Sequence, residues 1–183
     1  ATRRTTAPAA SKRRVCSGSS VQATSGRDVT LAIALLTISD TRTLAEDSSG
    51  DHLKTSLETA GHQLRERAVC RDDRYRIRAE LSRWIADPSI DVVITSGGTG
   101  LTGRDGTPEA VKPLLDKTIE GFGELFRVLS FETIGTSTLQ SRCLAGVANG
   151  TFVFVLPGSV DAVRTAWDRL IRAQLDPSTL PCN

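Results

Sequence analysis

Apolar runs and amphipathic stretches alternate along the chain from residue 31 onward. Residues 31–38 are almost entirely apolar, which is typical of a strand covered on both faces of a sheet. Residues 50–60 place Leu53 and Leu57 at helical spacing, and Gly61 supplies the stop signal. Gln63–Cys70 alternates weakly and predicts a second strand.

The alternation continues through residues 72–95. Either Asp72 or Asp73 is suited to cap the next helix, and Pro88 ends it. Residues 91–95 predict a third strand, which a glycine-rich segment follows at once. The apolar stripe of the intervening helix consists of Ile77, Leu81, Trp84 and Ile85.

The C-terminal half shows the same kinds of signal. Thr107-Pro108 predicts an N-cap followed by the first helical position, and Pro113 interrupts that helix early. Asn149-Gly150 predicts a hairpin turn before the strand Thr151–Leu156. Two further helices are indicated by apolar stripes, one formed by Phe122, Leu125, Phe126 and Leu129 and one formed by Val163, Trp167, Leu170 and Ile171.

Strands that alternate with helices predict an α/β fold. We expect three layers: a mostly parallel sheet with helices on both faces and a small antiparallel hairpin. Ligands of such sheets lie beyond the carboxyl ends of the strands. This rule selects four segments, which are residues 39–40, 71–73, 96–107 and 157–159.

Length and charge divide the 183 residues into two parts. Residues 1–30 carry six basic residues and one acid, without apolar periodicity, and predict a disordered basic tail that also resembles a transit peptide. Residues 31–183 then carry a net charge of −3, which argues against a nucleic-acid partner. No apolar run is long enough to cross a membrane, and four scattered cysteines predict free thiols in the cytoplasm.

The segment 96–105 reads SGGTGLTGRD and is the strongest chemical signal. Four glycines in about ten residues let the backbone approach a ligand, and successive amides in such a turn form an anion nest. We expect this loop to bind a phosphate. Gly98-x-Gly100-x-x-Gly103 fits a dinucleotide pattern, but the predicted helix begins only at Thr107. The spacing of a nucleotide P-loop is also present, without the lysine that such a loop requires.

Carboxylates beside an anion site repel the anion unless a cation lies between them. Mg²⁺ prefers one or two carboxylates together with phosphate oxygens. Asp105 and Asp73 are the pair that we expect to hold it, with a turn cap as the alternative role of Asp105 and a helix cap that of Asp73. For Asp40 a loop cap is expected.

Several segments, in the same order, resemble the MoaB/MogA/gephyrin-type family, and the MoaB branch in particular. They cover the chain from about residue 31 to its end. The segments are Ser96-Gly97-Gly98-Thr99-Gly100, Asp105-x-Thr107-Pro108-Glu109-Ala110, Glu120-Gly121-Phe122-Gly123-Glu124, residues 129–142, Leu156-Pro157-Gly158-Ser159 and Pro181-Cys182-Asn183.

The resemblance implies a role in molybdenum cofactor synthesis and a homo-oligomer, either a trimer or a hexamer. It implies that molybdopterin phosphate is adenylylated with Mg-ATP, with Asp73 and Asp105 as the functional acids. Members of the MoaB branch do not all keep these features, so a carrier protein without catalysis is the alternative. The residues implied in ligand binding are Ser96, Gly97, Gly98, Thr99, Gly100, Thr107, Pro108, Thr136, Ser137 and Ser159, with a loop cap as the alternative role of the last three.

Overall fold

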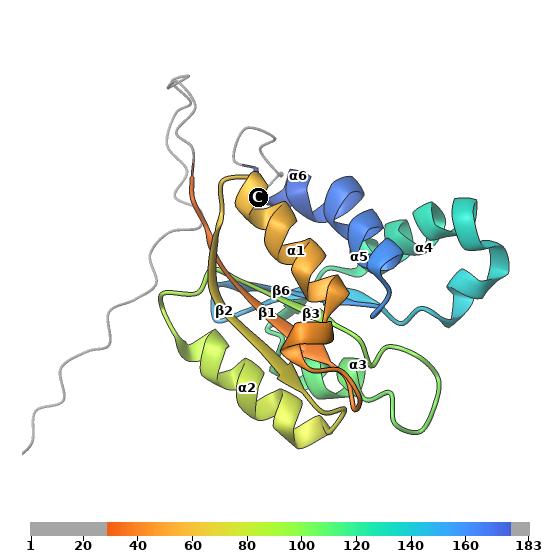
Figure 1. Cartoon of the computed structure of the whole chain (residues 1–183), viewed down its shortest axis with the longest axis horizontal. Helices are drawn as coiled ribbons and strands as arrows, with labels where there is room; N and C mark the ends of the chain where they lie inside the picture. Colours follow the sequence, from red (N-terminus) through yellow and green to blue (C-terminus); the bar gives the residue numbers. More distant parts are fainter. Residues whose placement is uncertain (1–28, 177–183) are drawn as a thin grey trace, which may run out of the picture.

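A computed structural model describes residues 29–176 of the chain. Residues 1–28 of the predicted basic tail and residues 177–183 lie outside the described part. The described residues form a six-stranded sheet between two layers of helices (Figure 1). This is the predicted fold class.

The sheet has the strand order β2-β1-β3-β6-β5-β4. The first four strands in this order are parallel, and β5 and β4 extend the sheet with antiparallel pairing. The carboxyl ends of β1, β3 and β6 therefore meet at one edge. The strands are β1 (Ala32–Ile38), β2 (Gln63–Cys70), β3 (Val92–Ser96), β4 (Lys117–Thr118), β5 (Leu144–Ala148) and β6 (Thr151–Leu156).

One face of the sheet is covered by α1 (Ser48–Thr59), α4 (Glu120–Ile134), α5 (Val160–Ala166) and α6 (Arg172–Leu175) (Figure 1). A π-helical turn, η4 (Trp167–Ile171), joins the last two. The other face is covered by α2 (Arg74–Ala86) and α3 (Thr107–Val111). Each face has its own apolar core, because side chains of the buried strands alternate between the two layers. Three short 3-10 turns complete the helical elements: η1 (Leu44–Glu46), η2 (Lys112–Leu114) and η3 (Gly135–Gln140).

The predicted hairpin is present between β5 and β6. Asn149 and Gly150 both have positive φ angles, of 49° and 76°, which a tight two-residue turn with the right-handed twist requires. Two details differ from the prediction. Thr107 begins α3 instead of capping it, with Gly106 in the cap position. The two-residue strand β4 is too short to leave a periodic pattern in the sequence.

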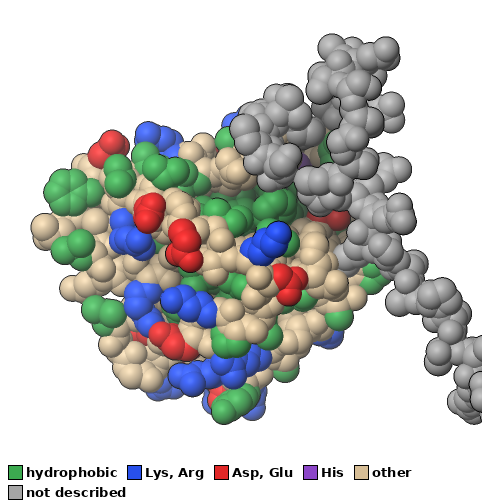
Figure 2. Space-filling view, turned by 180° about the vertical axis from the view of Figure 1, so that it is seen from behind, with side chains coloured by type: hydrophobic (Ala, Val, Ile, Leu, Met, Phe, Trp, Pro, Cys, Tyr) green, Lys and Arg blue, Asp and Glu red, His purple; other side chains and the backbone are tan. Residues whose placement is uncertain are grey.

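Helix α4 differs from the others in its outward face. Phe122 and Phe126 of the predicted stripe are buried, but Leu125 is 56% exposed. Val128 and Phe131 are also more than half exposed, and Leu139 of the following turn is 76% exposed. Hydrophobic side chains are visible at the end of the molecule that carries α4 and η3 (Figure 2). Within residues 29–176 no helix combines the length and apolar character needed to cross a membrane.

Candidate functional site

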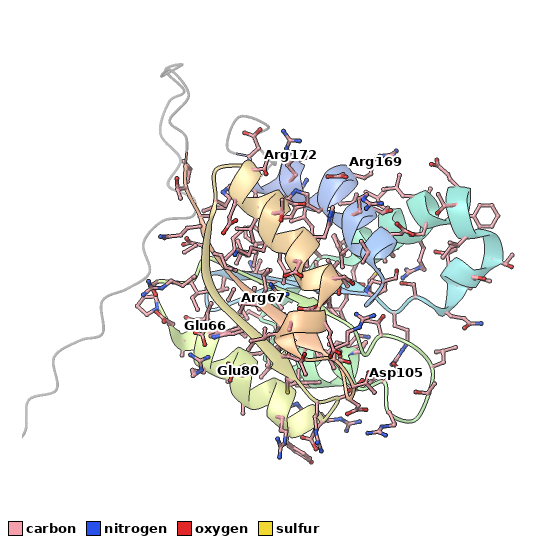
Figure 3. The ribbon with its side chains drawn as sticks, in the orientation of Figure 1. Glu66, Arg67, Glu80, Asp105, Arg169 and Arg172 are labelled. Carbon is pink, nitrogen blue, oxygen red and sulfur yellow. The ribbon has the colours of Figure 1, made fainter. Side chains whose placement is uncertain are left out.

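A cavity of about 680 Å³ opens at the carboxyl ends of β1, β3 and β6. The glycine-rich loop after β3 forms part of its wall, and Asp105 of that loop also lines it (Figure 3). Residues 157–159 after β6 and the side of α4 complete the enclosure. The cavity thus lies where the parallel-strand rule predicted a ligand site.

The glycine loop is held in a fixed shape from behind. Gly97 and Gly98 have positive φ angles of 106° and 65°. The amide of Gly97 donates to the carbonyl of Leu156 at 2.9 Å. Thr107 binds both glycine carbonyls, since its hydroxyl donates to Gly97 O at 2.9 Å and its amide donates to Gly98 O at 3.1 Å. These carbonyls are therefore occupied, and within residues 29–176 the amides of Gly98 and Thr99 donate to no protein acceptor.

Both glycines are also required by space. A Cβ on Gly97 would lie 2.2 Å from the carbonyl oxygen of Ile38. A Cβ on Gly98 would lie 2.2 Å from Thr107 Oγ1 and 2.6 Å from Asp72 Oδ2. Only glycine fits these positions, so the close packing of the loop explains the sequence signal.

Asp105 closes a turn, the role expected from the sequence as the alternative to metal binding, and it also lines the cavity. Its Oδ2 accepts from the amide of Thr102 at 2.9 Å and from the hydroxyl of Thr102 at 2.6 Å, which closes the turn 102–105. The Thr102 hydroxyl is the main cause that holds the pKa of Asp105 below its ordinary value, although burial opposes it. The amide of Gly100 and the charge of Arg142 act in the same direction. Asp105 is thus an ionised carboxylate that both caps a turn and lines the cavity.

The second acid beside the glycine loop is Asp72, while Asp73 has the helix-cap role that was its alternative in the sequence-based prediction. Asp73 is exposed, and its Oδ1 accepts the amides of Tyr75 and Arg76 as the N-cap of α2. Asp72 instead accepts the amide of Gly106 at 3.1 Å and lies against Gly98. The two acids are adjacent in the chain, and the helix cap takes the second one, so the first faces the loop.

Asp72 lies among charges of both signs. Burial raises the pKa of Asp72 above its ordinary value, the amide of Gly106 lowers it, the charges of Asp105 and Asp40 raise it further, and the charge of Arg104 lowers it. Within residues 29–176 no three His, Cys, Asp or Glu side chains gather into a metal site. Asp105 lines the cavity, whereas Asp72 lies against Gly98 and is not among the lining residues. The Asp105 carboxylate is compatible with Mg²⁺, which takes one or two carboxylates together with phosphate oxygens.

The other predicted residues fall into two groups. Gly97, Gly98, Thr99, Gly100, Ser137 and Ser159 line the cavity, and Ser159 also caps α5 through the amide of Ala162. Four predicted residues are not among its lining, which are Ser96, Thr107, Pro108 and Thr136. Ser96 is buried beneath the loop, with its hydroxyl 3.4 Å from that of Thr37. Thr107 is fully buried and acts through the glycine carbonyls.

Two arginines at the site were not singled out from the sequence. Arg42 lines the cavity, and its guanidinium donates to the carbonyl of Gly158 at 3.2 Å. Arg142 lies behind the glycine loop and donates to several of its carbonyls. Neither arginine belongs to a periodic pattern, and their hydrogen-bond partners are distant in the sequence. The only sequence signal that included either one was the family-like segment 129–142, which ends at Arg142.

A buried ion pair supports the β1 side of the cavity. Asp47 is fully buried and accepts hydrogen bonds from Thr37 Oγ1 at 2.6 Å, from the Gly50 amide at 3.0 Å and from Arg67 at 2.9 Å. Burial alone would raise the pKa of Asp47, but these three donors outweigh it and hold the pKa below its ordinary value. Because the Thr37 hydroxyl lies 3.4 Å from the Ser96 hydroxyl, the network connects β1, α1 and β2 to β3, the strand that precedes the glycine loop.

Comparison with known proteins agrees with this architecture. The family described as "Probable molybdopterin binding domain" matches residues 34–177. Molybdenum cofactor biosynthesis protein B of Escherichia coli (strain K12) is 54% identical over 151 residues, which cover 82% of this chain and 89% of that protein.

Solved structures show the same fold. A crystal structure of molybdenum cofactor biosynthesis protein B has a TM-score of 0.81 at 42% identity, covering 85% of this chain and 97% of that one. The tungsten cofactor synthesizing protein MoaB from Pyrococcus furiosus has a TM-score of 0.68 at 38% identity, covering 75% and 88%. By sequence and by fold, this chain belongs to the MoaB/MogA family of molybdenum cofactor biosynthesis proteins.

Proposed function

We propose that this chain binds molybdopterin in the cavity and adenylylates its phosphate with Mg-ATP. One observation carries the proposal: the amides of Gly98 and Thr99, which donate to no acceptor among residues 29–176, lie in the wall of a cavity that Asp105 also lines. Amides attract a phosphate, whereas carboxylates tolerate one only through a cation. A phosphate and a divalent ion together satisfy both sets of groups.

The proposed reaction is a transfer of AMP. An oxygen of the molybdopterin phosphate attacks the α-phosphorus of ATP, the bond from that phosphorus to the bridging oxygen breaks, and pyrophosphate leaves with the electron pair. A phosphate monoester has a second pKa near ~6, so the nucleophile is already ionised at neutral pH. The residues then need no general base and act by positioning and charge neutralisation.

Groups in and beside the cavity suit both substrates. Asp105 of the lining, together with Asp72 beside the glycine loop, would hold Mg²⁺, which neutralises phosphate charge when bound. Arg42 donates to the Gly158 carbonyl through Nη1, and its guanidinium has further N–H donors that suit a triphosphate oxygen. Phe126 and Ile134 of α4 provide an apolar wall, and the hydroxyls of Ser137 and Ser159 lie near it for polar atoms of a pterin. The proposal places this reaction in the cytoplasm, without a nucleic-acid partner.

The central test compares the wild-type chain with Asp105→Asn in an assay of adenylylated pterin from molybdopterin, ATP and Mg²⁺. We expect the wild type to form product and the variant to lose about a hundredfold or more in kcat, the scale of removing one electrostatic group from a transition state. Asp72→Asn should behave like Asp105→Asn, whereas Asp73→Asn should retain activity. Equal rates for Asp105→Asn and wild type would reject the metal role. Tight binding of molybdopterin by the wild type without ATP consumption would identify a carrier instead.

We also propose that the chain assembles with copies of itself, as a trimer or a hexamer. The support is the exposed apolar face that Leu125, Val128 and Phe131 form on α4, continued by Leu139 on η3. Exposed apolar side chains that are contiguous on one element mark protein contacts more often than isolated ones do. This face lies on the helix whose other side lines the cavity.

A further inference from the structure

Arg142 makes an unusual set of contacts with the glycine loop. It lies between η3 and β5, and its side chain is 28% exposed. Nε donates to the carbonyl of Gly100 at 2.9 Å and to that of Thr99 at 3.3 Å. A second nitrogen, Nη2, donates to the carbonyl of Asp105 at 2.7 Å. One guanidinium thus binds three carbonyls of a single loop.

The remaining nitrogen of Arg142 fixes the guanidinium itself. Nη1 forms an ion pair with Glu109, a residue of α3. Thr107 of the same helix holds the carbonyls of Gly97 and Gly98. The glycine loop is therefore held on its carbonyl side by two anchors, one from α3 directly and one from Arg142 resting on α3.

These contacts fix the backbone around Asp105. A peptide unit points its carbonyl and its amide in opposite directions, so the Thr99 carbonyl held by Arg142 keeps the Gly100 amide on the other side, where it donates to the Asp105 carboxylate. Holding the carbonyl of Asp105 also fixes the backbone from which the Asp105 side chain extends toward the cavity. Without Arg142, the loop 99–105 would lose the partners of three carbonyls at once.

We propose that Arg142 is a positioning residue that fixes the backbone of residues 99–105 and thereby presents the carboxylate of Asp105 at the cavity where the phosphate binds. This inference rests on the proposed function for the identity of the ligand. The claim about the loop itself does not depend on the ligand and is tested separately. Lysine cannot replace Arg142, because a single ammonium does not match the planar set of donors that three carbonyls and Glu109 occupy.

The first experiment examines the ligand-free chain by hydrogen exchange. In Arg142→Ala we expect the hydrogen-bonded amides of the loop, those of Gly100, Thr102, Asp105 and Gly106, to exchange about 10- to 100-fold faster, the scale of losing one set of charge-assisted hydrogen bonds. The core strands β1 and β3 should exchange as in wild type. Arg83→Ala is the matched control, because Arg83 pairs with Glu66 and Glu80 on the surface and does not line the cavity. Unchanged exchange of the Gly100, Thr102, Asp105 and Gly106 amides in Arg142→Ala would overturn the positioning role.

The second experiment measures molybdopterin binding and AMP transfer with chemical rescue. Arg142→Ala and Arg142→Lys should both raise the dissociation constant of molybdopterin by about 10- to 100-fold. Millimolar guanidinium should restore a measurable part of binding and kcat to Arg142→Ala, while ammonium should not. General unfolding would not respond to guanidinium in this way.

The outcomes separate the two proposals. A wild type that binds no molybdopterin rejects the proposed function, while the exchange experiment still decides the role of Arg142 in the loop. A wild type that binds molybdopterin, with Arg142→Ala binding equally well, rejects this inference and leaves the proposed function standing. Loss of binding that guanidinium fails to rescue, with exchange increased throughout the core, also rejects it, because Arg142 would then serve stability alone.

Discussion

At the scale of single residues, two adjacent carboxylates at the site make different contacts. Asp72 and Asp73 are both acids at the end of β2, yet one contacts the glycine loop and the other caps a helix. Gly98 likewise has no substitute, since Thr107 and Asp72 already occupy the space of a Cβ. At this scale, the site depends on which side chains lie within contact distance of the glycine loop.

Gly98→Ala tests this closeness directly. The new Cβ would lie 2.2 Å from Thr107 Oγ1 at a φ of 65°, so the loop must shift and its free amides must turn. We expect molybdopterin affinity to fall at least about tenfold, a change of roughly 1.4 kcal/mol. Gly103→Ala is the control, because a Cβ there meets nothing within 4 Å. Equal affinities of the two variants in calorimetry would contradict the role of the Gly98 turn.

At the scale of elements, three helices near the site begin at a capping side chain. Asp73 caps α2, Asp47 caps α1 and Ser159 caps α5. The segments before α1 and α5 line the cavity, so the caps of these two helices also hold cavity-lining loops.

Asp73→Ala should destabilise the chain without affecting chemistry. It removes the acceptor of the Tyr75 and Arg76 amides, and loss of such a cap costs about 1 kcal/mol of unfolding free energy. Asp73→Asn should retain most of the stability, because asparagine is also a good N-cap. Urea unfolding of the three proteins checks this order. A loss of AMP transfer in Asp73→Asn at unchanged stability would return the catalytic role to Asp73.

The Asp47 network should make stability depend on pH. Because the folded chain lowers the pKa of Asp47, its carboxylate contributes stability above the ordinary value of 3.8, and this contribution is lost as the pH falls through the lower folded pKa. Asp47→Asn should cost roughly 3 kcal/mol at pH 7, since it leaves Arg67 without its buried partner.

Urea unfolding between pH 7 and pH 3 would measure this effect. The difference in the free energy of unfolding between wild type and Asp47→Asn should become smaller below about pH 4. Asp51→Asn is the control, because Asp51 pairs with the same arginine but its side chain is 61% exposed, so its effect should stay below about 1 kcal/mol. A constant difference for Asp47→Asn across this range would show that its charge does not matter.

At the scale of the whole molecule, the two layers of helices leave one apolar face uncovered. α4 turns Phe126 toward the sheet and the cavity and turns Val128 and Phe131 outward. Association through this face would bury those side chains and restrain the helix that forms the cavity wall. Assembly and ligand binding would then be linked through a single element.

Phe131→Glu tests the proposed assembly. A buried glutamate without a partner opposes association, so we expect the oligomer to dissociate to monomers at micromolar concentration in analytical ultracentrifugation. Tyr75→Glu is the control, because Tyr75 is 74% exposed on α2, away from this face. A wild type that sediments as a monomer, or a Phe131→Glu variant that remains a trimer or hexamer, would refute the use of this face.

The sequence by itself determined the alternation of strands and helices, the hairpin at Asn149-Gly150, the glycine loop and Asp105, because periodicity, turn chemistry and glycine clusters are local signals. Only the tertiary structure decided which of two adjacent acids faces the loop, that Thr107 acts from behind it, and that Arg42 and Arg142 reach it from distant segments. Those assignments depend on side-chain direction and on contacts up to 116 residues apart, which no local pattern records.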